Sequence, residues 1–217
     1  MDITWHGHSC FTIKTKRGTA VFDPYDAATV GLKLPPLKAD LVLVSHNHEG
    51  HNNVKAVGGE PRVIDWPGEY EIKGIAVTAS KVAYSEAEKG KKHGYGLIFT
   101  MEADGLKLCF LGDMGEAPDT ALVESIGDID ILFLPIGGHT VMDPKQAHLV
   151  IEELEPRAVI PMHYKVTGSK SGASELEPFL KLVGASAPEP REKFTIGGRS
   201  ELKEDKMECI LLSPQTG

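Results

Sequence analysis

Short apolar runs separated by polar or glycine-containing turns dominate the first half of the chain, and they predict strands. Runs of three to five residues rich in β-branched and aromatic side chains are typical of strands with a buried face. Residues 24–36 and 85–96 lack such a pattern, and we expect loops there. The predicted strands are 3–5, 10–13, 19–22, 41–44, 62–64, 97–101 and 106–111, with a hairpin over 69–81 that turns at Lys73-Gly74.

The second half of the chain changes to an alternation of strands and helices. Asp143-Pro144 predicts a helix start, because aspartate caps a helix N-terminus and proline suits its first position. Strands followed by β-α alternation favour an α+β fold with two mixed sheets and helices outside them. The predicted helices are 120–126, 143–154 and 174–182, and the predicted strands are 130–135, 158–161 and 207–212.

Composition sets the class of molecule without choosing a function. The 217 residues are enough for a large core and are most simply one domain, 1–217, with two halves of about 1–105 and 106–217. With 41% hydrophobic and 25% charged residues, the chain is typical of a soluble globular protein. The net charge of -8 argues against nucleic acid or an anionic membrane as a partner.

The lack of a recognisable targeting signal and the pattern of cysteines favour a cytoplasmic protein. No apolar run approaches the ~20 residues of a membrane span, and the first residues lack the basic and apolar regions of a secretion signal. The cysteines lie in apolar strand-like stretches with no pairing pattern, which predicts buried free thiols in a reducing compartment. They are Cys10, Cys109 and Cys209.

Residues 45–52 hold three histidines directly after the predicted buried strand 41–44. His46 and His48 share a face if the segment is extended, and Gly50, which tolerates positive φ, lets His51 turn back toward them. Each imidazole has two nitrogens to satisfy, so three of them are costly as core filling but suit a zinc-type metal. A His-rich polar surface loop is the alternative that this stretch alone leaves open.

Three further predicted strands also end in a candidate metal ligand. The run 108–112 leads to Asp113, the run 131–134 leads through Gly137-Gly138 to His139, and the run 159–162 leads to His163. Because ligands collect at the carboxyl ends of strands in α/β sheets, we expect these side chains to lie near the histidine loop. Histidines with a carboxylate that can bridge have the composition of a dinuclear metal site.

Motifs spread over nearly the whole chain resemble those of the metallo-β-lactamase superfamily. The similarity is to its small UlaG-like branch of metal-dependent hydrolases, which contains the ascorbate-6-phosphate lactonase. The resemblance implies the αβ/βα four-layer sandwich with the site at one edge. The matching segments are 5–11 (W-x-G-H-[AS]-x-F), 22–24 (the D-P motif), 45–51 (S-H-x-H-x-D-H), 111–115 (L-G-D-L-G), 135–144 (P-[IV]-G-G…P) and 161–164 (P-M-H-Y).

Two positions depart from the family's motifs. Gly50 stands where the family carries an aspartate that ligates the second metal, and Ser85 stands where it carries a histidine for the first. The resemblance therefore implies one or two ions with an incomplete second site, most simply zinc, with manganese or iron as alternatives. The ligands that remain are His46 and His48 for the first ion, His51 and His163 for the second, and Asp113 as the bridge.

Supporting roles are expected for other polar residues. Glu49 is the only carboxylate in the histidine loop that can act as a base, and His8, in its family motif, is expected to orient a histidine or contact the substrate. Asp23 is expected to hydrogen-bond the histidine loop, with a plain turn carboxylate as the alternative. His139 and His93 are candidate replacement ligands, with exposed or hydrogen-bonded histidines as the alternative.

Residues and resemblance together favour a metal-dependent hydrolase, in which a metal-activated water attacks a small-molecule ester, lactone or phosphodiester. The alternative from another class is a catalytically degenerate binding or scaffold protein with one metal or none, marked by Gly50 and Ser85. The two hypotheses differ in whether the missing ligands are replaced in space. The substrate and the oligomeric state, including a homo-oligomer, stay open.

Overall fold

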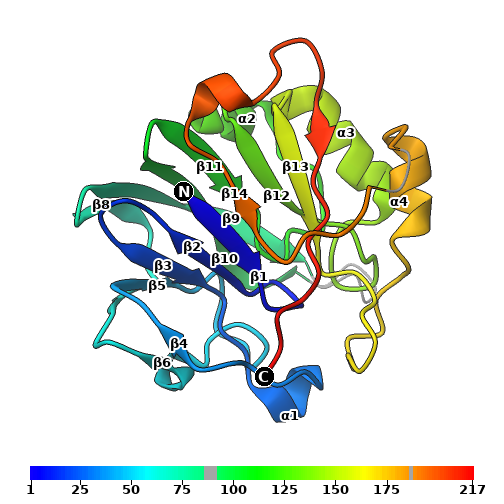
Figure 1. Ribbon diagram of the computed structural model, residues 1–217. Coiled ribbons are helices and arrows are strands. Elements are labelled where there is room, and N and C mark those ends of the chain that lie inside the picture. The colour runs from blue at the N-terminus through cyan, green and yellow to red at the C-terminus, as the bar shows by residue number, and fades with distance from the viewer. Residues whose placement is uncertain (86–91, 186–187) are drawn as a thin grey trace.

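Two β-sheets packed face to face form the centre of the computed structural model, which describes residues 1–85, 92–185 and 188–217, with side chains except at 83–85 and 92–93 (Figure 1). The first sheet is antiparallel from β14 to β3 and parallel from β3 to β7. Its strands, in spatial order, are β14 (Phe194–Thr195), β1 (Asp2–Trp5), β2 (Phe11–Lys14), β3 (Thr19–Phe22), β5 (Leu41–Leu43) and β7 (Arg62–Ile64).

The second sheet is parallel in its C-terminal part and antiparallel in the rest. Its strands, in spatial order, are β15 (Glu208–Cys209), β13 (Ala158–Met162), β12 (Ile131–Pro135), β11 (Leu106–Phe110), β10 (Lys92–Ala103), β9 (Ile75–Ser85) and β8 (Gly68–Ile72). The remaining elements are β4 (Leu37–Lys38) and β6 (Val57–Gly58), which pair with each other, the helices α1 (Ala27–Val30), α2 (Thr120–Ile126), α3 (Pro144–Leu154) and α4 (Glu177–Leu182), and the 3₁₀ turns Val54–Ala56 and Arg199–Glu201.

Apolar side chains fill the space between the sheets and cover both outer faces. Aromatic rings join the sheets, with the Phe11 and Phe133 centroids 4.8 Å apart and those of Phe22 and Phe110 also 4.8 Å apart. Helices α2, α3 and α4 contribute to the apolar cluster on the outer face of the second sheet, and α1 with the β4–β6 pair to the cluster on the first. This layering confirms the αβ/βα sandwich, with the first sheet covered by short elements.

Most predicted elements are present, and the differences have physical reasons. The loop predicted over 85–96 is wrong where the structure describes it, because β9 extends to Ser85 and β10 begins at Lys92, so that pairing between these consecutive strands overrides local composition. Helix α4 begins at Glu177, later than predicted, since the Ser174 N–H donates to the Gly137 carbonyl and ties that segment to a loop. Residues 24–36, predicted as loop, contain α1, capped by the Asp26 carboxylate.

The division of the chain into halves near residue 105 does not coincide with the division into sheets. Strands β8, β9 and β10, all before residue 105, belong to the second sheet, whereas β14 returns from the C-terminal half to the first. As a result, the loops at one edge of the sandwich come from distant parts of the sequence. Within the described ranges, none of the helices has the length and apolar character that crossing a membrane requires.

Candidate metal centre

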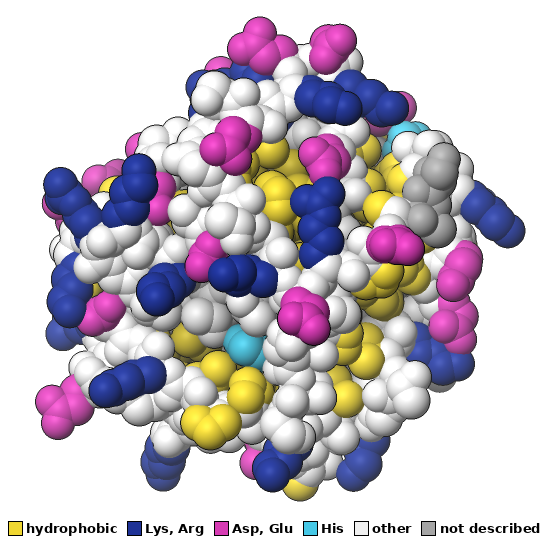
Figure 2. Space-filling model, in the orientation of Figure 1, with side chains coloured by type: hydrophobic (Ala, Val, Ile, Leu, Met, Phe, Trp, Pro, Cys, Tyr) yellow, Lys and Arg dark blue, Asp and Glu magenta, His cyan; other side chains and the backbone are white. Residues whose placement is uncertain are grey.

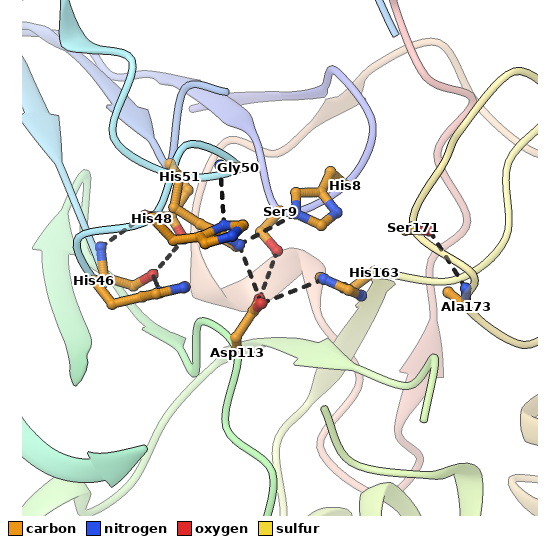
Figure 3. Close-up of polar contacts among 12 residues, drawn as sticks. His8, Ser9, His46, His48, Gly50, His51, Asp113, His163, Ser171 and Ala173 are labelled. Carbon is orange, nitrogen blue, oxygen red and sulfur yellow. Dashed lines mark hydrogen bonds and ion pairs between the residues drawn. The ribbon is translucent and has the colours of Figure 1, made fainter. Parts of the chain in front are cut away.

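The predicted ligands lie in loops that follow strands of both sheets, and they converge on one spot (Figure 3). His8 lies in the turn between β1 and β2, and the histidine loop 45–51 follows β5, so both belong to the first sheet. Asp113 follows β11 and His163 follows β13, so both belong to the second sheet. The candidate centre therefore spans the interface between the sheets at one edge.

The Asp113 carboxylate is the middle of the cluster. Its Oδ2 lies 3.0 Å from His51 Nε2 and 3.3 Å from His163 Nε2, while Ser9 Oγ donates to its Oδ1 at 3.2 Å. His8 Nε2 lies 3.2 Å from His51 Nε2. One potential ligand atom from each of His8, His51, Asp113 and His163 falls within 4.8 Å of the other three.

These separations fit a metal ion. Two ligand atoms bound at 2.0–2.1 Å to a tetrahedral ion lie about 3.3 Å apart, close to the measured spacings. His51 donates its Nδ1–H to Asp23, so its Nε2 carries the lone pair when the ring is neutral, and that lone pair faces the Asp113 carboxylate. Two acceptors 3.0 Å apart require a positive particle, either a proton or a metal ion. The chemistry of the donor set therefore suits a divalent cation.

Asp23 orients two of the histidines from below, as predicted. Its buried carboxylate accepts from the Ser45 backbone N–H at 2.7 Å, from Ser45 Oγ at 2.6 Å and from His51 Nδ1 at 2.9 Å. Because the Ser45 hydroxyl proton points to Asp23, the contact of 3.0 Å between Ser45 Oγ and His46 Nδ1 puts the ring proton of His46 on Nδ1. Carboxylate support of this kind fixes the tautomer of a metal-binding histidine.

Burial and neighbouring charges shift the pKa values of the cluster's residues in different directions. Burial raises the pKa of Asp113, but the neighbouring His163 and His51 outweigh it and hold that pKa well below its usual range. Burial lowers the pKa of His51, yet the charges of Asp113 and Asp23 raise it to about 10. Burial, followed by repulsion from other histidines, lowers the pKa of His8 well below its usual value and that of His46 to about 3. His8 and His46 are thus neutral, as a metal ligand must be.

A second group of possible ligands overlaps the first. His46, His48 and His51 also offer nitrogens within 4.8 Å of one another, with the His46 and His51 ring centroids 4.1 Å apart. His51 cannot complete both groups, because its Nδ1 is bound to Asp23 and only Nε2 remains for an ion. His48 is exposed, and its Nδ1 accepts from the Gly50 N–H at 3.1 Å. The four-residue group around Asp113 is therefore the better-formed site.

Several site residues adopt backbone conformations that side chains rarely take. His8, Asp23 and His163 have φ of 52°, 41° and 55°, in the left-handed region. Such strain of about 1–3 kcal/mol per residue persists where surrounding structure enforces it, often at functional sites. Gly50, by contrast, is not among the positive-φ glycines, so the expectation that it turns the chain by positive φ is wrong.

A hollow of about 230 Å³ opens beside the cluster. Lys170 stands on its wall and donates its Nζ to the Ala28 carbonyl at 3.1 Å. The chain thus provides a small chamber that is lined by the candidate ligands and by one cation, Lys170. Its lining residues are His8, Thr29, Val30, His48, Gly50, His51, Asp113, Thr140, His163, Lys170 and Ser171.

Two predicted site residues, Glu49 and His139, are not brought to this centre. The Glu49 carboxylate accepts from Thr29 Oγ1 at 3.1 Å in an exposed position and lines a neighbouring hollow. His139 is exposed and belongs to neither ligand group among the residues described. The side chain of His93 lies outside the described part of the structure, as does that of Ser85. The roles of Glu49 and His93 stay predictions.

Other contributors to the site were not assigned from the sequence. Ser9 hydrogen-bonds Asp113, and Ser45 hydrogen-bonds Asp23. Both serines adjoin a motif histidine, His8 and His46, and this position in the sequence could have identified them. Thr140, Lys170 and Ser171 come from loops with no pattern that pointed to a site.

Comparison with known proteins gives one consistent family. The model of the β-lactamase superfamily domain matches residues 2–163. The chain is 31% identical to a UPF0173 metal-dependent hydrolase of Thermoplasma acidophilum, over 76% of this chain and 83% of the relative. It is 30% identical to a UPF0173 metal-dependent hydrolase of Thermococcus onnurineus, over 86% and 94%.

A solved structure agrees with these sequence relatives. A crystal structure of a metallo-β-lactamase superfamily protein from Thermotoga maritima superposes with a TM-score of 0.79 at 33% identity. The superposition covers 98% of this chain and 99% of that one, so the likeness extends over both sheets and the loops between them.

Proposed function

Because the chain belongs to the metallo-β-lactamase superfamily, we propose that it is a metal-dependent hydrolase whose metal centre is the histidine–aspartate cluster between the two sheets. The observation that carries the proposal is the convergence of imidazole nitrogens on the buried Asp113 carboxylate, at spacings that suit an ion. The related proteins are named metal-dependent hydrolases, and these names support hydrolysis as the class of reaction. Membership of the UlaG-like branch stays a finer prediction.

Zinc is the metal that the ligand chemistry favours. Imidazole nitrogens with one carboxylate are borderline ligands typical of zinc, with manganese and iron as alternatives. When bound, such an ion supplies Lewis acidity, which lowers the pKa of water toward neutrality and polarises the bond to be cleaved. His51, His163 and Asp113 would hold the ion, and His46 and His48 would be the ligands of a second, weaker position.

The role of the surrounding residues is to hold the candidate ligands in place. Asp23 fixes His51 directly and His46 through Ser45, and Ser9 fixes the Asp113 carboxylate through its Oδ1. Because the donor set is already held in place, no free energy is needed to rearrange it when the substrate binds.

A small molecule is the substrate that the site's size favours. A hollow of 230 Å³ is below the range of roughly 300–1,000 Å³ that drug-sized ligands occupy. The net charge is -8, and Figure 2 shows acidic and basic side chains interspersed on the face it presents. Both features disfavour a nucleic-acid polyanion. An ester, lactone or phosphodiester fits, and Lys170 on the wall suits a substrate with an anionic group.

The test combines metal analysis with a substrate screen. Untagged protein is loaded with zinc, manganese or iron, dialysed, analysed by plasma mass spectrometry and assayed on chromogenic esters, lactones and phosphodiesters. We expect bound metal and hydrolysis of at least one class, both lost in Asp113→Ala and retained in the exposed control Asp128→Ala. Absence of bound metal after loading would instead favour the degenerate binding protein.

A further inference from the structure

Gly50 leaves a space that an imidazole fills. A Cβ built on Gly50 would lie 3.0 Å from His48 Nδ1 and 3.1 Å from His8 Nε2, tighter than nine in ten real Cβ contacts, so that the neighbouring rings would have to shift. The backbone there does not need glycine, since φ of Gly50 is outside the left-handed region. The residue is therefore small because the two rings occupy the place that its side chain would take.

His8 is held rigidly in that place. Its carbonyl accepts from Trp5 Nε1 at 3.0 Å and from the His163 N–H at 3.1 Å, which ties the turn between β1 and β2 to the His163 loop. The ring centroid of His8 lies 4.1 Å from that of His163 and 4.7 Å from that of His51. The backbone thus directs this ring into the cluster from the first sheet.

The ring nitrogens of His8 make few contacts besides the one with His51. Its Nε2 faces His51 Nε2 at 3.2 Å, and its buried Nδ1 has no hydrogen-bond partner among the described residues. A buried polar ring with this arrangement is costly unless its lone pair binds something. His51 Nε2, which it faces, is itself aimed at the Asp113 carboxylate.

We propose that His8 is a direct metal ligand that replaces the aspartate missing at position 50, so that the ion is held by His8, His51, His163 and Asp113. Exchanging a carboxylate for an imidazole makes the donor set richer in nitrogen and the occupied site more positive by one charge. His8 belongs to the family motif, and the absence of a side chain at Gly50 leaves the ring of His8 the place beside the cluster that it occupies. The assignment rests on the metal centre of the proposed function and does not depend on hydrolysis.

A positioning role is the competing explanation for His8. In that case the ring only hydrogen-bonds His51, and its removal weakens metal binding about 10–100-fold, as is usual for partners outside the ligand shell. An aspartate restored at position 50 would then not compensate. The two explanations differ in the behaviour of a double variant.

The experiment measures zinc stoichiometry and affinity by chelator competition for the full chain, His8→Ala, Gly50→Asp and the double variant His8→Ala/Gly50→Asp. We expect His8→Ala to lower zinc affinity more than about 100-fold. Gly50→Asp alone is expected to bind poorly, because the new side chain meets the ring of His8 inside the cluster, whereas the ring of His48 is exposed and has room to shift. The double variant is expected to recover affinity to within about tenfold of the parent, a margin set by the spread of such measurements.

Spectroscopy and matched controls complete the test. Cobalt-loaded parent protein is expected to show a visible spectrum that changes in the double variant, because a carboxylate replaces a nitrogen donor. His148→Ala on α3 and Gly198→Asp, where a Cβ meets nothing within 4 Å, should leave zinc binding unchanged. Circular dichroism establishes that each variant is folded.

Two results would overturn the assignment. One is a His8→Ala variant that keeps affinity within about tenfold, which is less than even the loss of a supporting partner costs. The other is a double variant that stays as weak as His8→Ala while folded. Metal binding that depends on His8, without hydrolysis of any substrate, would contradict the proposed function alone.

Discussion

Single residues at this site act through what they exclude or orient as much as through what they bind. Gly50 marks a departure from the family motif at the level of sequence, yet in the structure it makes room for His8 and His48. Asp23, which the sequence allowed as a plain turn carboxylate, holds His51 and Ser45 from a fully buried position. Both effects depend on distances that the residue type alone does not reveal.

Removing the Asp23 carboxylate should destabilise the protein strongly. Asp23→Ala leaves the Ser45 N–H and the His51 Nδ1–H without an acceptor, and breaking a buried charged pair costs about 3–5 kcal/mol. Urea unfolding in the presence of a chelator measures the change without a contribution from metal. The exposed control Asp128→Ala should shift the free energy of unfolding by less than about 0.5 kcal/mol. A loss below about 1 kcal/mol in Asp23→Ala would contradict the orienting role.

Replacing Glu49, the general base predicted from the sequence, tests whether its carboxylate is needed for activity. Its carboxylate is hydrogen-bonded to Thr29 and lines a different hollow, so Glu49→Gln should leave kcat/KM of the substrate found in the screen within about threefold. A positioned general base contributes roughly 10²–10⁴-fold. A fall of 100-fold or more with unchanged metal content would restore Glu49 as the base.

At the scale of helices and strands, the sequence predicts where a helix starts when a capping residue is present. Helix α3 starts where Asp143-Pro144 predicted, because Asp143 accepts from Lys145 N and Gln146 N while Gln146 Oε1 accepts from the Asp143 N–H. The 85–96 region shows the opposite case, in which pairing between β9 and β10 decides the structure. Sequence patterns cannot show a strand whose stability comes from its neighbour.

The cap of α3 should contribute a measurable share of stability. Asp143→Ala removes the acceptor of two backbone N–H groups at the helix start and should lower the free energy of unfolding by about 1 kcal/mol. Denaturant unfolding measures it, with the exposed Glu153→Ala of the same helix as the control. An equal effect in both variants would mean that the cap adds nothing beyond helix propensity.

At the scale of the whole molecule, the candidate metal centre lies between two sheets that the chain builds from interleaved segments. His8 and the 45–51 loop extend from the first sheet, whereas Asp113 and His163 extend from the second. An ion bound by residues of both sheets acts as a cross-link between them. Binding only to the folded state stabilises that state by mass action.

Metal removal should therefore lower the melting temperature of the whole protein. At a free zinc concentration 100-fold above Kd, the stabilisation is about 2.7 kcal/mol. For a chain of this size that corresponds to a shift of about 5–10 °C on chelation. Scanning calorimetry with and without chelator measures it, and Asp113→Asn should show little or no shift. An equal shift in Asp113→Asn would place the bound metal elsewhere.

The sequence by itself determined the two-sheet architecture, most strands and helices, and the candidate metal ligands His46, His48, His51, Asp113 and His163, because apolar periodicity and motif spacing are local properties. The tertiary structure decided that His8 faces His51 and His163, that Glu49 and His139 lie outside the cluster, and that Gly50 is small to make room. These outcomes depend on the packing of loops far apart in sequence, since residues 8, 51, 113 and 163 meet only once both sheets have formed.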